Sequence, residues 1–263
     1  MRIGKVAQAK KSSSDEAISI LKITEGAITF CVLGKTPLIL HRLAKKAQNE
    51  LLLPARRKNS AEKASSLKHN PYEEFRDSAD RSIDDAAPTR LMIAAACFKK
   101  SMASAALDIP GTAKAQIGRL TYVPGDFVHV YGIPKLHMAI TRSADINHTP
   151  DVRTRCIVPE WAAYVTVTYV KPILREQEIA NLMAAAGIMR GVGDWRPEKG
   201  AGSYGQFELV SADDERFTRI IRDGGREAQD ERLAKPVCYN AETQELLTWF
   251  DEESARRGFQ VAA

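Results

Sequence analysis

Hydrophobic and polar residues alternate most regularly over residues 161–170. The odd-numbered side chains from Ala163 to Tyr169 would face one way and the even-numbered ones the other, which is the two-residue period of a β-strand. Residues 27–33 show the same preference for β-branched and aromatic side chains, and Gly34 follows them. Two strands are therefore predicted at these positions.

A helical period replaces this alternation after the second strand. Apolar side chains recur at i, i+3, i+4 and i+7 from Ile179 onward, which predicts an amphipathic helix over residues 176–186. Gly187 comes next, where many helices end in a left-handed residue. A returning strand is then expected at residues 206–210.

Shorter elements are predicted elsewhere. Residues 38–53 are expected to form a helix with a basic face, residues 91–96 a short strand before a helix of small residues at 98–107, and residues 120–141 several strands. A strand, a helix, a glycine loop and a returning strand make up half of a ferredoxin-like fold. The predicted fold class is α+β with a modified ferredoxin-like (RRM-like) core, and other α+β sheets are the alternative.

The chain is divided by composition into four parts. Residues 1–24 are predicted to be a polar N-terminal arm, and residues 25–210 the core. Residues 42–90 are charged, contain several prolines and are poor in apolar side chains, so they are interpreted as a basic arm inserted into the core. Residues 211–263 are expected to form an acidic, partly helical C-terminal tail.

Charge differs on the two sides of residue 210. Residues 1–210 carry 30 Lys and Arg against 21 Asp and Glu, and residues 211–263 carry 8 against 12, so a net charge of +9 is followed by −4. A basic body favours an anionic partner. The acidic tail is expected either to shield that body or to dock on a neighbouring copy.

Several classes of protein are disfavoured. The longest apolar runs, such as residues 91–98, are too short to cross a bilayer, and the N-terminus lacks the apolar region of a secretion signal. We therefore expect a cytoplasmic protein of a bacterial host with no membrane partner. The four cysteines show no CxxC spacing and the five histidines are not paired at ligand spacing, so no metal, cofactor or catalytic residue is expected.

The segment between residues 187 and 205 combines six glycines with basic and aromatic side chains. Its glycines are Gly187, Gly191, Gly193, Gly200, Gly202 and Gly205. It lacks both the GxGxxG pattern of dinucleotide sites and the Gly-Lys-Ser/Thr of phosphate loops. It is interpreted as a loop whose backbone approaches the phosphates of a polymer, and a tight structural connection is the alternative.

Ten residues are candidates for nucleic-acid binding. Trp195 and Tyr204 are expected to stack on bases. Contacts to phosphate are expected from Lys99, Lys100, Arg142, Arg153, Arg155, Arg190, Arg196 and Lys199. A secondary basic arm comprises Arg42, Lys45, Lys46, Arg56, Arg57 and Lys58, although a solvated helical face explains that cluster equally well. His148 and Asp151 would suit a general base and its carboxylate, but a polar turn explains them without catalysis.

Two stretches resemble the RAMP superfamily, the RRM-like proteins that include the crRNA-binding backbone subunits of CRISPR effector complexes. They are Cys97-Phe98-Lys99-Lys100 with the small-residue helix that follows, and the glycine loop from Gly191 to Phe207. Together they cover roughly residues 90–210. Residues 194–199 depart from the family as an insertion. The whole chain also resembles uncharacterised proteins of phages and mobile elements.

The resemblance implies an RRM-like core, a thumb-like arm at residues 42–90, binding of single-stranded RNA or DNA along a basic groove, and head-to-tail assembly of copies. It implies no cleavage site. Our leading hypothesis is a non-enzymatic single-stranded nucleic-acid-binding protein of phage or mobile-element origin. The alternative is a protein-interaction or assembly subunit, such as an inhibitor of a host defence complex, and a metal-dependent nuclease ranks last.

Overall fold

The computed structural model describes residues 20–43, 45–52, 67–142, 149–199 and 202–259. Most of the predicted arm at residues 1–24 lies outside these ranges. Four of the predicted binding residues also lie outside them, namely Arg56, Arg57, Lys58 and Gly200. Within the described ranges, no helix has both the length and the apolar character needed to span a membrane.

The largest sheet has four strands, each antiparallel to its neighbours. In spatial order they are β10 (Phe207–Val210), β1 (Thr24–Gly34), β9 (Ala162–Lys171) and β5 (Thr121–Tyr122). Helix α4 (Ala95–Ala105) separates β1 from β5 in the chain, and α6 (Glu176–Met189) separates β9 from β10. Numbered along the chain, the four strands have the spatial order 4-1-3-2, which is the ferredoxin-like arrangement of a β-α-β-β-α-β unit. The predicted fold class is therefore confirmed.

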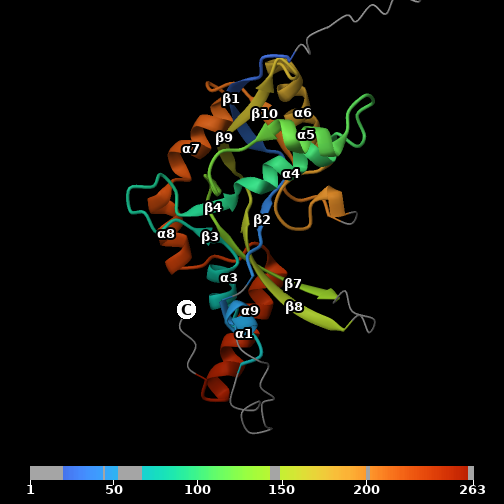
Figure 1. Ribbon diagram of the computed structural model, residues 1–263. Coiled ribbons are helices and arrows are strands. Elements are labelled where there is room, and N and C mark those ends of the chain that lie inside the picture. Colours follow the sequence, from blue (N-terminus) through green and yellow to red (C-terminus); the bar gives the residue numbers. More distant parts are fainter. Residues whose placement is uncertain (1–19, 44, 53–66, 143–148, 200–201, 260–263) are drawn as a thin grey trace, which may run out of the picture.

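Helices cover one face of this sheet. They are α4, α6 and α5 (Lys114–Leu120) (Figure 1). Phe98 of α4 is fully buried and meets Phe207 of β10 edge to face, with ring centroids 5.8 Å apart. Burial of a side chain of this size stabilises a fold by about 1.5–3 kcal/mol. Ser101 lets α6 pack closely on α4, and its hydroxyl donates to the carbonyl of Gly191 at 3.0 Å.

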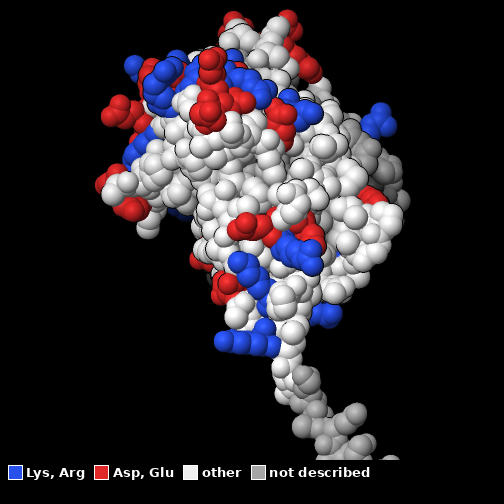
Figure 2. Space-filling view, turned by 90° about the horizontal axis from the view of Figure 1, so that it is seen from above, with Lys and Arg blue, Asp and Glu red and all other residues white. Residues whose placement is uncertain are grey.

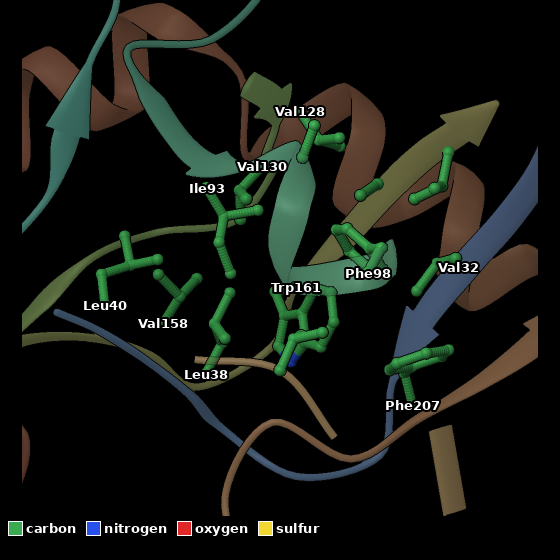
Figure 3. Packing of buried hydrophobic residues seen from close by; sticks show 14 of the residues in the cluster. Val32, Leu38, Leu40, Ile93, Phe98, Val128, Val130, Val158, Trp161 and Phe207 are labelled. Carbon is green, nitrogen blue, oxygen red and sulfur yellow. The ribbon is translucent and has the colours of Figure 1, made fainter. Parts of the chain in front are cut away.

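Two three-stranded sheets extend the same core. One has the order β2 (Leu38–Leu40), β8 (Pro150–Val158), β7 (Lys135–Arg142), and the other the order β3 (Asp80–Arg81), β4 (Leu91–Ala94), β6 (Phe127–His129). Figure 3 shows Leu38 and Val158 of the former close to Ile93 of the latter, with Trp161 between them and Phe207. One apolar core thus joins all three sheets.

The predicted helix at residues 38–53 is wrong in its first part. Leu38, Ile39 and Leu40 are all buried and pair with β8, because a strand with apolar surroundings on both faces lacks the alternation that would identify it. Helix α1 begins only at Lys45 and ends at Leu52. Strand β8 was not predicted as such, because a polar turn was expected at His148 and Asp151 with an extended segment after it, and no helix was predicted at α5.

The described part of residues 42–90 packs on the body. Helix α3 (Pro71–Asp77) begins with Asn70 as its N-cap, whose side chain accepts from the amides of Tyr72 and Glu73. Phe75 of this helix is fully buried. The hydroxyl of Ser78 accepts from the amide of Cys156 in β8 at 2.7 Å. The few apolar residues of this stretch therefore belong to the core.

Three C-terminal helices lie against different parts of the body, as Figure 1 shows: α7 (Glu215–Asp223), α8 (Arg226–Ala234) and α9 (Ala241–Arg256). Helix α7 covers the second face of the main sheet, where Phe217 packs with Leu33 and Ala162. Helix α9 lies along β7, and its Thr243 hydroxyl accepts from the amide of Met138. Each helix buries apolar or hydrogen-bonding groups against the body.

Candidate nucleic-acid interface

The glycine loop lies tightly against the end of β2. The amide of Asp194 donates to the carbonyl of Ile39 at 2.9 Å, and the amide of Gly205 donates to Pro37 at 2.8 Å. Gly193 has a φ of 82°, and a Cβ there would come 2.6 Å from the carbonyl oxygen of Ile39. A side chain at Gly193 would therefore strain the backbone and collide with β2. These contacts correspond to the tight connection considered as the alternative.

A cleft of about 340 Å³ opens between this loop and the ends of β2 and β4. Gly193, Asp194, Arg196 and Lys199 line it on the loop side. Leu40, His41, Asp80, Met92, Ile93, Ala94 and Cys97 are among the residues that line it elsewhere. Segments that are far apart in the sequence thus meet at one concavity.

Asp194 lies between two cationic or ionisable side chains. Its Oδ2 is 3.8 Å from His41 Nδ1 and 3.7 Å from Arg155 Nε, distances longer than those of good hydrogen bonds. The Arg155 side chain is only 13% exposed. Its Nη1 donates to the carbonyl of Thr154, but among the described residues its buried Nε has no hydrogen-bond partner. Arg155 is therefore a buried guanidinium with incomplete hydrogen bonding, which is unfavourable.

The pKa of His41 is lowered by its surroundings. Burial lowers this pKa first, and the charge of Arg155 lowers it further, against the opposing effect of Asp194. Burial likewise lowers the pKa of Arg155, although a guanidinium stays charged at neutral pH. His41 is consequently mostly neutral at pH 7, and protonation would be favoured by an added anion.

Two arginines of the predicted set are occupied by carboxylates. Arg196 donates from Nη2 to Glu198 at 2.6 Å and from Nη1 to the carbonyl of Gly193 at 2.8 Å. Arg190 pairs with Asp108 at the opposite end of the loop. Lys199 is exposed beside the cleft. The side chain of Lys199 is therefore freer to meet a ligand than either arginine.

Trp195 and Tyr204 contact each other instead of facing open solvent. Their ring centroids lie 6.1 Å apart, and Trp195 is also 6.1 Å from His137 of β7, which in turn lies 5.3 Å from Tyr239. Trp195 has a φ of 50°, an uncommon conformation for a bulky residue. Both predicted stacking residues are half-buried, so each presents only part of its ring.

The other predicted residues are spread more widely. Arg153 shares a face of β8 with Arg155 and lies 3.5 Å from Asp151, and Arg42 lies 3.3 Å from Asp80 at the cleft. Lys100 is exposed on α4. Lys99 instead lies 5.8 Å above the ring of Tyr122. Arg142 ends β7, and Lys45 and Lys46 begin α1.

Charge is mixed at the end of the molecule near β1 and β10. In Figure 2, which looks down on that end, basic and acidic side chains lie interspersed between broad neutral areas. At the cleft, Arg196 and Lys199 belong to the lining, while Arg42 and Arg155 lie behind it, next to the lining carboxylates Asp80 and Asp194. Sequence reasoning missed His41, Asp80 and Asp194 because only the pairing of β2 with β8 and the path of the loop bring them together.

Cation coordination is not indicated in the part of the chain that the structure describes, where no group of three or more His, Cys, Asp or Glu could hold a metal ion. The fold and the cleft define the class of this protein as a ferredoxin-like α+β protein with a cleft of mixed charge beside its glycine loop. No protein-family model and no curated protein matches the chain.

Two solved structures show a distant likeness. One is a chain from the cryo-EM structure of the type III-B Cmr-beta bound to cognate target RNA, with 15% identity and a TM-score of 0.35 over 71% of this chain and 59% of that one. The other is Cmr6 from Pyrococcus furiosus, with 11% identity and a TM-score of 0.36 over 71% of this chain and 98% of that one. The assignment of the fold rests on the strand order described above.

Proposed function

We propose that this protein binds single-stranded nucleic acid, RNA or DNA, and holds its phosphates at the cleft beside the glycine loop. The observation that carries the proposal is the open cleft lined by His41 at the end of β2 and Lys199 of the loop, with Arg155 of β8 behind it, 3.7 Å from the cleft residue Asp194. A phosphate in the cleft would bond to Lys199 and be attracted by the nearby charge of Arg155. A planar guanidinium binds such an anion more specifically than an ammonium group does.

The ten predicted binding residues contribute unequally in this proposal. Arg155, Arg153, Lys100 and Lys199 provide the first phosphate contacts. Arg190 and Arg196 contribute only where a phosphate replaces Asp108 or Glu198 as their partner. Trp195 and Tyr204 offer half-buried rings to a base near the loop. Lys99 and Arg142 provide further contacts to the strand away from the cleft. The phage or mobile-element origin and the assembly of copies stay predictions.

Fluorescence anisotropy with labelled RNA and DNA oligonucleotides of one sequence tests the proposal. We expect binding that weakens steeply with salt, because each phosphate contact releases counterions, with a logarithmic slope of about 0.7 per contact for single strands. Arg155→Gln together with Lys199→Ala should lower that slope by about 1.4. Arg222→Gln is the matched control, since Arg222 is exposed on α7 and pairs with Asp223.

Two results would contradict the proposal. One is the absence of binding to either oligonucleotide at low salt. The other is binding that the Arg155→Gln, Lys199→Ala double variant leaves as tight and as salt-dependent as the Arg222→Gln control does. Circular dichroism of the three proteins establishes that the comparison is made between folded chains.

A second candidate function is that of an assembly subunit. Trp249 of α9 is 62% exposed and borders an apolar groove of about 350 Å³ formed with Leu246, Phe250 and Phe259, and exposed apolar surface of this kind is typical of interaction sites. Trp249→Ala should then dissociate oligomers in size-exclusion chromatography with light scattering. Deleting residues 211–263 is unsuitable as a test because it would uncover the core beneath Phe217 and Gln229. A wild-type chain that is monomeric at all concentrations would contradict this function.

A further inference from the structure

The cleft beside the glycine loop has two chemically different walls. The loop wall carries Lys199, Arg196 in its ion pair with Glu198, and the carboxylate of Asp194. The opposite wall is formed by the buried side chains Leu40 and Ile93, with the half-buried Met92. One part of a ligand in this cleft would therefore meet apolar surface while another part meets positive charge.

A single carboxylate interrupts the apolar wall. Asp80 of β3 pairs in register with Met92 of β4, so it belongs to the same wall. Its Oδ1 lies 3.3 Å from Arg42 Nε. Burial raises the pKa of Asp80, and the charge of Arg42 opposes that rise. Among the described residues, Asp80 has no other hydrogen bond or ion pair from its side chain to a protein group, so its carboxylate retains capacity to accept from a ligand.

The dimensions of the cleft suit one nucleotide. Its volume of about 340 Å³ falls at the lower end of the range for small-molecule sites, roughly 300–1,000 Å³. Proteins that bind single-stranded RNA often separate a base from its neighbours, surround it with apolar or aromatic side chains and bond its Watson–Crick edge. An apolar wall with one acceptor, facing a wall with cations, matches a base and its phosphate respectively.

We propose that this cleft accepts one unstacked nucleotide of the bound strand, with its base on the wall of Leu40, Ile93 and Asp80 and its phosphate at Lys199. The inference rests on the proposed function and adds a base preference to it. A carboxylate accepts hydrogen bonds from the amino groups of adenine, cytosine and guanine. Uracil has no amino group: its one donor on the same edge, N3–H, lies between two carbonyl oxygens that the carboxylate repels. The cleft therefore prefers a base with an exocyclic amino group over uracil.

Cys97 provides a direct probe because its half-buried thiol lines the cleft. The native chain is alkylated with N-ethylmaleimide, and the rate at each cysteine is followed by peptide mass spectrometry. Cys31 and Cys238, also half-buried but not among the residues that line this cleft, are internal controls. Nucleoside monophosphates are added one at a time, together with inorganic phosphate as a separate sample.

We expect AMP, CMP and GMP to slow alkylation of Cys97 severalfold at concentrations about tenfold lower than UMP, with Cys31 and Cys238 unaffected. Asp80→Asn should remove most of this difference, because an amide both donates and accepts. Binding of an oligonucleotide rich in cytosine should be weakened by Asp80→Asn more than binding of a uracil-only oligonucleotide of equal length.

The possible failures are distinguishable. If strands bind but no mononucleotide or oligonucleotide protects Cys97, the nucleotide pocket is wrong and the proposed function stands. Protection by inorganic phosphate equal to that by AMP shows an anion site without a base site, which also overturns the inference. If no strand binds and Cys97 is never protected, the proposed function and the inference fail together.

Discussion

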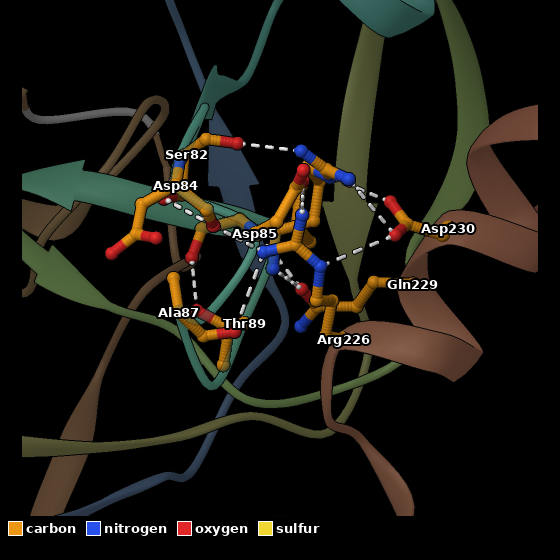
Figure 4. Close-up of polar contacts among 10 residues, drawn as sticks. Ser82, Asp84, Asp85, Ala87, Thr89, Arg226, Gln229 and Asp230 are labelled. Carbon is orange, nitrogen blue, oxygen red and sulfur yellow. Dashed lines mark hydrogen bonds and ion pairs between the residues drawn. The ribbon is translucent and has the colours of Figure 1, made fainter.

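The cleft and the junction of α8 with the body contain similar residues but differ in how completely their polar groups are bonded. At the junction, Arg90 donates to both carboxylate oxygens of Asp230 at 2.6 and 3.1 Å and to the carbonyl of Ser82. Figure 4 shows Arg226 bridging Asp230 and Asp85 beside this pair. At the cleft, Arg155 reaches Asp194 only at 3.7 Å.

The difference separates a structural polar cluster from a candidate binding site. Gln229 at the junction is fully buried, accepts from the amides of Arg90 and Leu91, and donates to the carbonyls of Val130, Gly132 and Gly224. Such a network leaves nothing for a ligand to complete. The cleft is open, and the exposed Lys199 and the carboxylate of Asp80 can bond to a ligand there, which would gain interactions that the protein does not make with itself.

The largest expected effect is on the junction. Gln229→Leu leaves the buried amide of Leu91, the part-buried amide of Arg90 and three buried carbonyls without their side-chain partner. Each such buried group costs about 1–3 kcal/mol when nothing replaces the bond. Because some of these groups retain other bonds, we expect a loss of about 4 kcal/mol in the free energy of unfolding. Urea denaturation measures it. Gln177→Leu on the exposed face of α6 is the control, and equal midpoints for both variants would contradict the structural role.

Replacing an arginine by glutamine should affect stability at the junction and strand binding at the cleft. Arg90→Gln removes charge-assisted bonds to Asp230 and should lower stability by about 2–3 kcal/mol while leaving strand binding unchanged. Arg155→Gln should change stability by less than about 1 kcal/mol but weaken strand binding about tenfold. Denaturation and anisotropy on both variants test this. A larger stability loss for Arg155→Gln than for Arg90→Gln would make the cleft arginine a structural residue.

Binding at the cleft should depend on pH through His41. The pKa of His41 in the free protein is lowered below its usual value of about 6.5, first by burial and then by Arg155. A bound phosphate would raise that pKa, so binding takes up a proton and affinity increases as pH falls below about 6.5. Anisotropy titrations between about pH 7.5 and pH 5.5, roughly one unit on either side of the usual histidine pKa, measure this dependence of affinity on pH. His41→Asn should flatten the profile, and an unchanged slope would exclude His41.

The stability of the junction between α8 and the body should depend on pH at acidic values. The hydrogen bond from Arg90 lowers the pKa of Asp230. A carboxyl group with a depressed folded-state pKa contributes stability above its unfolded pKa of about 3.9 and loses it as pH falls through the folded value. Stability of the wild type should therefore fall more steeply below about pH 4 than that of Asp230→Asn. Parallel acid unfolding curves for both proteins would contradict the pairing.

The smallest effect is expected at Asp194. Its carboxylate lies nearest to His41 and Arg155 and repels a phosphate that approaches them. Asp194→Asn keeps the side-chain acceptor that receives the amide of Trp195 and should tighten strand binding about threefold. Asp126→Asn, at an exposed turn, is the control. Weaker binding by Asp194→Asn would show that the carboxylate contacts the strand favourably.

Local pattern predicted the elements that have one buried face. Strand β9 and helix α6 begin within a residue or two of their expected positions because alternate or helically spaced side chains enter the core. The interpretation failed at β2, where all three residues are buried, and at β8, where Arg153, Arg155 and Asp151 give a polar appearance to a strand. In both places neighbouring strands determined the structure.

The candidate site shows the same division. The glycine loop was recognisable from composition, as were Arg155, Arg196 and Lys199 as basic residues. The contacts between distant segments were not recognisable: Arg155 of β8 lies beside Asp194 of the loop, and Arg190 pairs with Asp108 from 82 positions away. Which cations are occupied and which remain available depends on such contacts.

By itself, the sequence determined the α+β class, the ferredoxin-like half that follows β9, and the basic character of the first 210 residues, since these depend on local periodicity and residue type. Only the tertiary structure decided that Gly193 fits against β2, that Gln229 holds α8 to the core, and that His41, Asp80 and Asp194 meet at one cleft. Those outcomes depend on backbone hydrogen bonds and burial between distant segments, which no short-range pattern encodes.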